Sequence, residues 1–453
     1  LRAQVRDSAG EWLESVLVGE QDALVQATAA VAVIKLRLGS EPADERGLDA
    51  IGAQLASLYT AGAGDVALEG LSYLTLGGTK SASPIKSALV VPDSAFLAAL
   101  LPTEPPRQRA APSAYTLATL LHHLTLYPPL SAAPALPAAL APAPEARELV
   151  STRNATLLTY ALLPTLATLA ASASSSRSTG ALTAQVYLAL TEPQAARPAL
   201  LAAGVAKALR QLVDLHDAAV HATARLLITA DPSLVFSPAP LHSTALVLAA
   251  ALPLHPDDLL RTFELLMALT NIASLGGPPA EALAPSLPTI EALMLSPNTM
   301  VRRAASELAC NLVGNSDGGV EWYESRPGSV EILLALCGSE DQPTSEAASG
   351  AVAALVEATS GVAFAVFASD KGCKALLSLV ESGEEGCWVR GWDWVRSLGR
   401  WLGERVEGAE PARAQANKSR RALDEVRDRA EGQERFEADE SMAALDRGLA
   451  VRR

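Results

Sequence analysis

Aromatic residues are scarce in this sequence. Phe, Trp and Tyr make up 4% of its 453 residues, although hydrophobic residues of all kinds reach 49%. Alanine and leucine supply most of this apolar content, and both are strong helix formers. Sheet-rich proteins use more β-branched and aromatic residues, so the composition favours an all-α fold.

An excess of positive charge is also missing. The formal net charge is -14 at pH 7 and the isoelectric point is about 5.0. Nucleic acids and anionic membrane surfaces are bound through basic patches, so neither is an expected partner. An acidic protein is better suited to basic surfaces of other proteins.

Cysteine is rare and scattered. Cys310, Cys337, Cys373 and Cys387 form no C-x-x-C pair and have no closely spaced histidines, which argues against a disulfide framework or a zinc site. We expect buried or half-buried thiols in a reducing compartment, and neither metal nor cofactor. The sequence begins with Leu1 and shows no signal peptide, so we expect a fragment that lacks an N-terminal part.

Motifs of catalysis are absent from the sequence. It contains no H-E-x-x-H, G-x-S-x-G, Walker loop or dinucleotide fingerprint. The adjacent His122 and His123 would point to different sides of a helix, so they cannot easily share a metal. We therefore expect no enzymatic activity and no catalytic residue.

One uncharged stretch is long enough to cross a bilayer. No charged residue occurs between Arg153 and Arg177, but Pro164 and many serines and threonines interrupt the stretch. We expect a buried helix followed by a polar loop rather than a membrane span.

Helical patterns begin close to the N-terminus. Apolar residues at helical spacing predict helices at 20–38, 48–60 and 65–76. The breaks that end them are Glu41-Pro42, Gly62 with Gly64, and Gly77-Gly78. Three short helices joined by tight turns indicate a repeated helical unit, and residues 1–101 are assigned to armadillo-like repeats.

Proline and alanine crowd the segment that follows. They are densest at 102–114 and 128–144, and proline is not tolerated inside stable helices. Residues 102–145 are therefore predicted to be a linker or long surface loop. It would separate the N-terminal repeats from a longer block at 146–406.

The longer block shows an internal period. Residues 207–213 (KALRQLV) and 374–380 (KALLSLV) share five of seven positions at an offset of 167 residues, or four steps of about 42. This period is typical of armadillo and HEAT repeats. It predicts an α-solenoid of helical repeats, each burying its apolar face against its neighbours.

A polar residue recurs within these units. Asn271 and Asn311 lie 40 residues apart, and Glu357 takes the corresponding place in the third copy, with Glu replacing Asn. Such an Asn can hydrogen-bond the backbone of an extended peptide through its acceptor and its donor. It can equally cap or bridge neighbouring repeats, and both interpretations stay open.

A basic pair precedes the second of these asparagines. Arg302 and Arg303 lie on a helix predicted to begin near Asn298. One arginine could face a carboxylate of a ligand, or the pair could be balanced by Glu307 in the same helix.

The C-terminal part changes in composition twice. A helical stripe of Trp388, Trp392, Val395, Leu398 and Leu402 is assigned to core packing or to an end cap in preference to a partner surface. Residues 407–453 are crowded with charges of both signs. We predict a charged tail there, either a solvated helix or disordered.

Five segments of the sequence occur in the order found in a known family. They are residues 29–36 (AAVAVIKL), 69–76 (EGLSYLTL), 224–236 (ARLLITADPSLVF), 266–274 (LMALTNIAS) and 301–313 (VRRAASELACNLV). Together they resemble the UCS family of myosin chaperones, and the resemblance covers about 20–100 and 190–405. The segments around Asn271 and from Arg302 to Val313 are its most specific parts.

The resemblance implies an armadillo-repeat solenoid that binds the myosin motor domain and assists its folding and stability, working with Hsp90 and Hsp70. Animal members carry an N-terminal tetratricopeptide domain and fungal members lack it. No 34-residue pattern of that kind is present, so the chain resembles the fungal type. A client groove carried over from the family would include Asn271, Arg302, Arg303 and Asn311, to which the repeat adds Glu357. Self-association is left open.

A generic armadillo scaffold for linear peptides is the alternative. Nuclear-import adaptors of that kind use a regular array of paired Trp and Asn residues, and the tryptophans are missing from the positions around Asn271 and Asn311. A hydrolase is disfavoured by the lack of a nucleophile constellation.

Overall fold

The computed structural model describes residues 2–39, 43–76, 80–104, 109–128, 145–172, 176–382, 385–404 and 409–451. This part of the chain is mainly helical and contains no strand. It divides into two compact units, Leu1–Thr229 and Ala230–Arg453.

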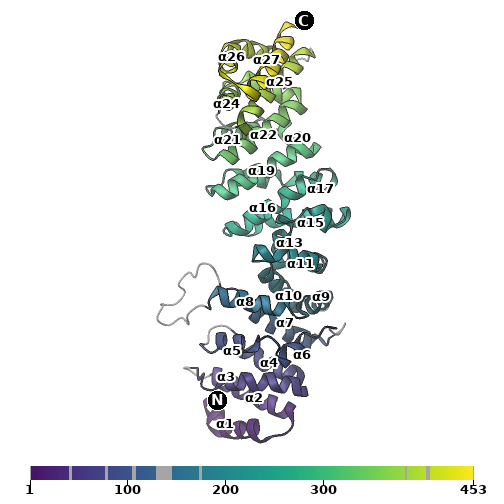
Figure 1. Ribbon diagram of the computed structural model, residues 1–453, viewed down its shortest axis with the longest axis vertical. Coiled ribbons are helices and arrows are strands. Elements are labelled where there is room, and N and C mark those ends of the chain that lie inside the picture. Colours follow the sequence, from purple (N-terminus) through teal and green to yellow (C-terminus); the bar gives the residue numbers. More distant parts are fainter. Residues whose placement is uncertain are drawn as a thin grey trace. The chain divides into compact units, whose positions relative to one another are not determined.

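The first unit contains the helices α1 to α13 (Figure 1). Their bounds are α1 Arg2–Gly19, α2 Ala23–Leu38, α3 Leu48–Leu58, α4 Gly64–Thr75, α5 Ala82–Leu89, α6 Ala95–Leu100, α7 Ala111–Thr125, α8 Arg147–Leu158, α9 Leu162–Ala171, α10 Arg177–Leu190, α11 Arg197–Ala202, α12 Val205–Leu209 and α13 Asp217–Ile228. A wide turn at Tyr59–Ala63 and a 3₁₀ turn at Gln194–Ala196 lie between them.

The second unit contains the helices α14 to α27. Their bounds are α14 Pro232–Val235, α15 Pro238–Ala251, α16 Leu259–Ala273, α17 Gly277–Glu281, α18 Leu287–Met294, α19 Thr299–Asn315, α20 Asp317–Glu324, α21 Pro327–Leu336, α22 Gln342–Ala358, α23 Ser360–Ala368, α24 Asp370–Val380, α25 Glu385–Gly403, α26 Glu410–Arg429 and α27 Gly432–Ala450. Two 3₁₀ turns occur at Leu252–Leu254 and Ala284–Ser286.

The three helices predicted near the N-terminus are confirmed as α2, α3 and α4. Between α3 and α4 the chain reverses through Gly62 and Gly64, whose φ angles are 103° and 53°. Only glycine adopts such positive angles without strain, which explains why the pattern breaks there. The other two predicted breaks, Glu41-Pro42 and Gly77-Gly78, lie outside the described residues.

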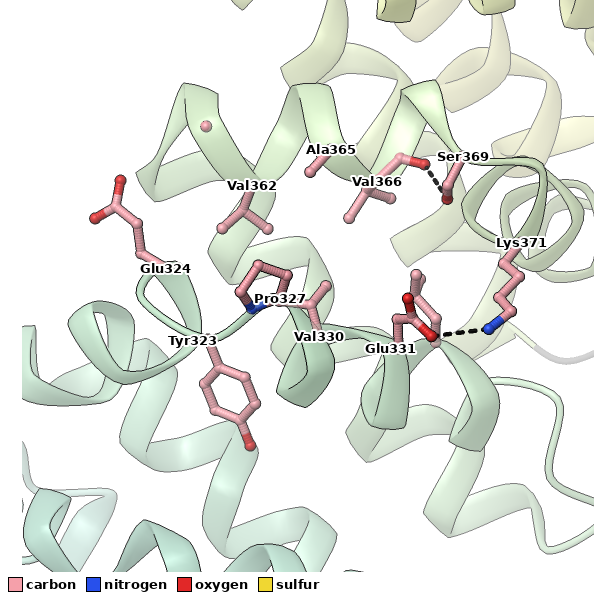
Figure 2. A pocket seen from close by; sticks show the side chains of 12 residues that line it. Tyr323, Glu324, Pro327, Val330, Glu331, Val362, Ala365, Val366, Ser369 and Lys371 are labelled. Atoms are coloured by element: carbon pink, nitrogen blue, oxygen red, sulfur yellow. Dashed lines mark hydrogen bonds and ion pairs between the residues drawn. The ribbon is translucent and has the colours of Figure 1, made fainter.

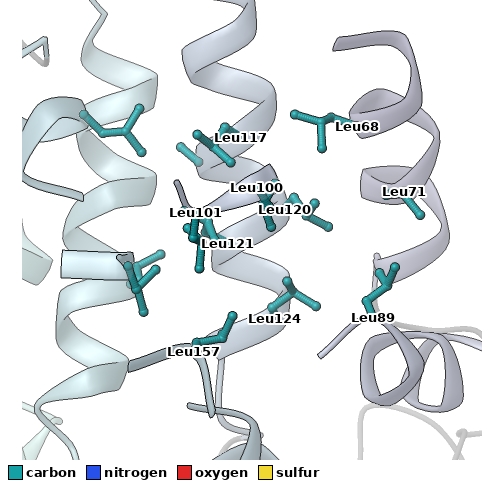
Figure 3. Close-up of a cluster of buried hydrophobic side chains, with 14 of the residues drawn as sticks. Leu68, Leu71, Leu89, Leu100, Leu101, Leu117, Leu120, Leu121, Leu124 and Leu157 are labelled. Atoms are coloured by element: carbon teal, nitrogen blue, oxygen red, sulfur yellow. The ribbon is translucent and has the colours of Figure 1, made fainter. Parts of the chain in front are cut away.

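The prediction of a linker over residues 102–145 is wrong for its middle part, which forms α7. Four leucines of this helix are fully buried, Leu117, Leu120, Leu121 and Leu124. They lie in one cluster with leucines of α4, α5, α6 and α8 (Figure 3). Pro112 is tolerated because it occupies the first turn of α7, where its missing N–H costs no hydrogen bond. Residues 129–144 lie outside the described residues.

Each unit contains a row of helices that pack against one another in succession. In the first unit the row consists of α2, α4, α7, α10 and α13, and in the second of α16, α19, α22, α25 and α27. We call the second of these the long row. Its members lie one above the next in Figure 1, with the shorter helices α17, α20, α21 and α24 beside them.

The repeat period predicted from the sequence is confirmed in the second unit. Two short helices and one long helix form each repeat, as α17–α18–α19, α20–α21–α22 and α23–α24–α25. These repeats begin at Gly277, Asp317 and Ser360, so they are 40 and then 43 residues long. The similar segments 207–213 and 374–380 begin on short helices, α12 and α24. The chain thus has an armadillo-like α-solenoid fold.

The tryptophan stripe is buried, as predicted. Trp392 and Trp394 of α25 are completely inaccessible and Trp388 is 8% exposed. The indole N–H of Trp394 donates to the Ser349 carbonyl of α22 at 3.2 Å. Trp401 donates in the same way to the Val356 carbonyl at 2.7 Å. Two ring N–H groups therefore hold α25 against its neighbour in the long row.

The predicted solvated or disordered tail is not found in residues 410–450, which form α26 and α27. Both helices pack against earlier helices, α26 on α23 and α27 on α25. Each helix has apolar residues at helical spacing that form a buried face, so Leu423, Val426, Met442 and Leu445 are buried despite the charged composition.

The uncharged stretch from Arg153 to Arg177 forms two helices and not one. Helices α8 and α9 meet at an angle of 83°. Within the described residues, no single helix is long and apolar enough to cross a membrane. Helices α8 and α9 reach that length and hydropathy only when the bent pair is counted as one segment.

Candidate functional site

Three helices of the long row start in the same way. The side chains of Asp258, Asn298 and Asp341 cap α16, α19 and α22 by accepting a hydrogen bond from the backbone N–H three residues further on, at 3.0, 3.1 and 3.2 Å. Such caps satisfy a backbone donor that the helix leaves open. They also fix a common register, so positions in the three helices can be compared by counting from the cap.

This register corrects the predicted polar series. Asn271 and Asn311 each lie thirteen residues after their cap, but the equivalent residue of α22 is Ala354. Glu357 lies three residues later, almost a full turn away. The sequence comparison chose a residue 46 positions after Asn311, whereas the caps of α19 and α22 are 43 residues apart.

Glu357 lies in a different place from the two asparagines. It lines a polar hollow of about 570 Å³ where α19 and α22 end, together with Glu281, Asn315 and Asp317. Its carboxylate oxygen is 3.9 Å from a guanidinium nitrogen of Arg400. Glu357 therefore lies at the helix ends, almost one turn beyond Ala354, which lines the same hollow.

Asn311 joins two neighbouring repeats. Its side-chain Nδ2 donates to the backbone carbonyl of Thr270 in α16 at 3.2 Å. This is the bridging role, one of the two that the sequence left open. Asn271 is half-buried at the equivalent position of α16. Contact of either residue with a peptide stays a prediction.

The two arginines have different environments. Arg303 forms a bidentate contact with Asp341, with Nη2 to Oδ1 at 2.6 Å and Nε to Oδ2 at 3.3 Å. Arg302 instead donates from Nη1 to the Ser296 carbonyl at 2.9 Å, within the turn that precedes α19. The carboxylate that balances the pair is therefore Asp341 of the next repeat, in place of the expected Glu307.

The contact between Arg303 and Asp341 changes the pKa of the Asp341 carboxyl. The hydrogen bonds from Arg303 lower the pKa of Asp341 to about 2. The neighbouring Glu307 is half-buried, and loss of hydration raises the pKa of its carboxyl.

The asparagines belong to a larger surface that we call the long-row stripe. Residues five, nine and thirteen positions after each cap share one helix face, and all nine are half-buried. They are Phe263, Met267 and Asn271 on α16, Arg303, Glu307 and Asn311 on α19, and Glu346, Gly350 and Ala354 on α22. Of the five predicted site residues, the structure brings Asn271, Arg303 and Asn311 together on this stripe.

One end of the long-row stripe is apolar. Phe263 and Met267 lie there, and the exposed side chains of Leu259, Leu260 and Met300 extend the patch at the start of α16 and α19, each between 44% and 48% exposed. Exposed apolar patches on soluble proteins often mark interaction sites, and methionine adapts to irregular partners. The sequence analysis missed these residues, although counting from the caps would have found Phe263 and Met267.

The other end of the stripe is charged. A Cβ atom at Gly350 would lie 3.0 Å from Nε of Arg390 and 3.0 Å from Sγ of Cys310. The Arg390 side chain of α25 therefore lies across Gly350, beside Cys310. No sequence signal identifies this contact, because it depends on how α25 packs against α22.

Side chains that could bind a metal do not gather in the part of the chain that the structure describes. No cluster of three or more His, Cys, Asp or Glu side chains there could hold a metal ion. The four cysteines are free thiols. His122 and His123 have ring centroids 5.9 Å apart, and His123 Nδ1 hydrogen-bonds the Thr75 hydroxyl at 3.1 Å.

Comparison with known proteins identifies relatives over part of the sequence. Unc-45 homolog B of Danio rerio is 31% identical over 182 residues, which is 39% of this chain and 19% of the relative. Ring assembly protein 3 of Schizosaccharomyces pombe is 30% identical over 218 residues, 44% of this chain and 27% of the relative. The chain is homologous to UNC-45 and to ring assembly protein 3. No protein-family model matches the sequence.

Solved structures of UNC-45 and of a further protein, She4p, share the fold. UNC-45 from Drosophila melanogaster matches with a TM-score of 0.81 at 21% identity, over 99% of this chain and 59% of that one. She4p matches with a TM-score of 0.74 at 19% identity, over 98% of this chain and 62% of that one. The chain thus corresponds to about three fifths of those two structures.

Functional descriptions are attached to some of these UNC-45 structures. One concerns a chaperone that binds and folds muscle myosin, with a TM-score of 0.73 at 21% identity, over 96% of this chain and 46% of that one. Another is the C. elegans myosin chaperone in complex with an Hsp90 peptide, with a TM-score of 0.67 at 21% identity, over 97% of this chain and 52% of that one. The curated relatives include animal and fungal proteins, so assignment to the fungal type stays a prediction.

Proposed function

We propose that this chain is a chaperone that binds the myosin motor domain and assists its folding and stability. It would work with Hsp90 and Hsp70 in the cytoplasm, without a cofactor and without catalysis. The observation that carries the proposal is homology to UNC-45 over 182 residues. The C. elegans UNC-45 structures contain peptides of Hsp90 and of Hsp70, which supports the two chaperone partners.

The long-row stripe is the surface that we propose for the client. A partly folded motor domain exposes apolar side chains and backbone amides, and the stripe offers groups for both. Phe263 and Met267 would contact apolar segments. The Asn311 amide donates to Thr270, which leaves its acceptor oxygen available for a client N–H. The charged side chains of Arg303 and Glu307, in the middle of the stripe, would set the register of the client.

Thermal aggregation of a purified myosin motor domain, with and without this chain, tests the activity. Citrate synthase serves as the generic client. We expect suppression of myosin aggregation and little effect on citrate synthase. Suppression of both would indicate a holdase without a preference for myosin, and suppression of neither would contradict the proposal.

Substitutions in the apolar patch that extends the long-row stripe test the surface. Leu260→Glu combined with Met300→Glu places two carboxylates in the apolar patch at positions that are already 48% and 46% exposed, so folding should persist. We expect protection of the motor domain to fall about tenfold in potency. The matched control is Leu234→Glu, at an exposed site on α14 that is 85% accessible. Equal protection by both variants would remove the stripe from the proposal.

A generic armadillo scaffold for linear peptides is the alternative function. The register of the caps gives it little support, since the polar series ends with Ala354 after two asparagines. Binding of short extended peptides to the stripe with no effect on motor-domain aggregation would favour the scaffold.

A further inference from the structure

A second hollow surface lies on the short helices of the second unit. A cavity of about 310 Å³ opens between α20 and α21 on one side and α23 and the start of α24 on the other (Figure 2). None of its lining residues belongs to the long-row stripe. We call it the short-helix pocket.

The floor of the short-helix pocket is apolar and held in place by packing. Val330, Leu334, Val362 and Val366 line it, and each is at most 8% exposed. Pro327, Gly361 and Ala365 lie at the exposed mouth. Figure 2 shows Val362 and Val366 of α23 facing Pro327 and Val330 across the opening. Such a floor gains free energy by burying a further apolar side chain.

The rim of the short-helix pocket is negatively charged. Lys371 is paired with Glu331, with Nζ 2.8 Å from Oε2. Glu324 accepts a hydrogen bond from the Thr359 hydroxyl at 2.7 Å, and no cation pairs with it in the described chain. Two carboxylates and one ammonium group therefore leave one negative charge, at Glu324, beside an apolar floor.

The small volume of the short-helix pocket limits the shape of a ligand that can enter it. A volume of about 310 Å³ is at the small end of the roughly 300–1,000 Å³ seen for ligand pockets. An α-helix with side chains is about 10–12 Å across, too wide to enter so small a space. An extended segment points alternate side chains to opposite sides, so one or two apolar side chains can enter while their neighbours remain at the rim.

We propose that the short-helix pocket binds an extended segment of a partner protein that carries one or two large aliphatic residues flanked by Lys or Arg. The aliphatic side chains fill the space over Val330, Val362 and Val366, and a basic neighbour pairs with Glu324. Because this pocket and the long-row stripe lie on different helices, the two surfaces can be occupied independently. The inference does not depend on the proposed myosin activity.

The probe for this pocket is a fluorescein-labelled peptide, Gly-Lys-Leu-Ser-Leu-Lys-Gly, titrated into the full chain by fluorescence anisotropy. Two control peptides replace both leucines by serine or both lysines by glutamate. We expect saturable binding of the probe only, at least about tenfold weaker for either control peptide and weaker at high salt, because the exposed charge pair is screened. Equal binding of the leucine and serine peptides would overturn the proposal.

Substitutions localise the binding. Ala365→Trp fills the mouth from an exposed position and should weaken probe binding about tenfold or more. Ala292→Trp, at an exposed alanine of α18, is the matched control and should change binding less than twofold. Glu324→Lys should reverse the preference between the lysine and glutamate peptides. Circular dichroism verifies that each variant is folded, and unchanged binding by Ala365→Trp would overturn the proposal.

Discussion

At the scale of single residues, Asp341 performs two tasks at the boundary between two repeats. It caps α22 by accepting from the Thr344 backbone N–H at 3.2 Å, and it pairs with Arg303 of α19. The cap decides where one long helix starts, and the pair attaches that start to the helix before it. Loss of this one side chain should therefore affect both the local helix and the stacking of repeats.

We predict that Asp341→Ala lowers the free energy of unfolding by about 1–2 kcal/mol, the usual cost of a lost cap together with a half-buried ion pair at the protein surface. Asp341→Asn keeps a capping side chain and should cost less than about 1 kcal/mol. Urea unfolding followed by circular dichroism measures both. Equal losses in the two variants would show that the ion pair, and not the cap, is the main contribution.

The stability that Asp341 and Arg303 contribute to the fold depends on pH. Because the folded pKa of Asp341 is about 2, below its ordinary value of 3.8, the carboxylate stabilises the fold above pH 3.8. This contribution is lost as the pH falls towards 2. Asp341→Asn should therefore flatten the acid limb of the stability curve in that window.

His123 should produce a second, separate acid sensitivity in the first unit. Burial lowers its pKa from 6.5 to about 4, helped by the nearby His122 and Lys86. The unfolded chain therefore takes up a proton below pH 6.5 that the folded chain accepts only near pH 4, so stability falls across this window by roughly 3 kcal/mol.

We predict that His123→Asn removes most of this pH dependence, because Asn cannot be protonated but can still hydrogen-bond Thr75. Thermal melts between pH 7 and pH 4 provide the measurement. His255→Asn, at an exposed histidine of the second unit, is the control and should leave the slope as it is in the unsubstituted chain. An unaltered slope in His123→Asn would show that other groups cause the acid sensitivity.

At the scale of helices, α25 and α27 approach unusually closely. A Cβ atom at Gly448 would lie 2.2 Å from the Gly399 carbonyl oxygen, and one at Gly399 would lie 2.4 Å from the Ala444 carbonyl carbon. No side chain fits between the two backbones at this crossing. The charged composition of residues 407–453 hid this contact from the sequence analysis, because two glycines carry it and glycine has no hydropathy pattern.

We predict that Gly448→Ala loosens α27 from α25 at a cost of about 1–3 kcal/mol, the range for overpacked contacts. Gly403→Ala is the matched control, since the nearest atom to its added Cβ is 3.9 Å away. Hydrogen exchange of α27 amides should accelerate in the first variant alone. Similar exchange in both variants would contradict the close contact.

The same scale shows what the sequence could and could not predict. Helical periodicity and glycine breaks were sufficient to predict α2, α3 and α4. The period of about 42 residues was sufficient to predict the repeats of the second unit. The prolines around Ala111–Thr125 concealed α7 because a segment rich in proline suggests a linker. A single proline in the first turn of a helix is in fact tolerated. In the candidate site, Asn271 and Asn311 were placed together correctly. Glu357 was misplaced because it lies 46 residues after Asn311, three more than the spacing between the caps of α19 and α22. The position of Arg390 depends on packing alone.

At the scale of the whole molecule, the chain divides between Thr229 and Ala230 into two compact units. Each unit has buried leucines of its own and its own row of packed helices. Compact units with their own cores often fold independently.

We predict that residues 1–229 and 230–453, expressed separately, each give a cooperative thermal transition and a helical circular dichroism spectrum. In a control pair divided after Glu307, inside α19, neither fragment should show the transition of the second unit, because the cut splits a helix of the long row. His123→Asn should change the acid sensitivity of the first fragment only. A molten, non-cooperative melt of either fragment would contradict the division into two units.

The distribution of tryptophan gives the chain a built-in optical reporter. Four of its six tryptophans, Trp388, Trp392, Trp394 and Trp401, lie on α25, whereas the first unit contains Trp12 alone. Indole emission moves to longer wavelength when water reaches the ring, so the fluorescence of the intact protein follows mainly one helix. A red shift during denaturation or client binding will therefore record the release of α25 from α22. Unfolding of the first unit will change the tryptophan fluorescence very little.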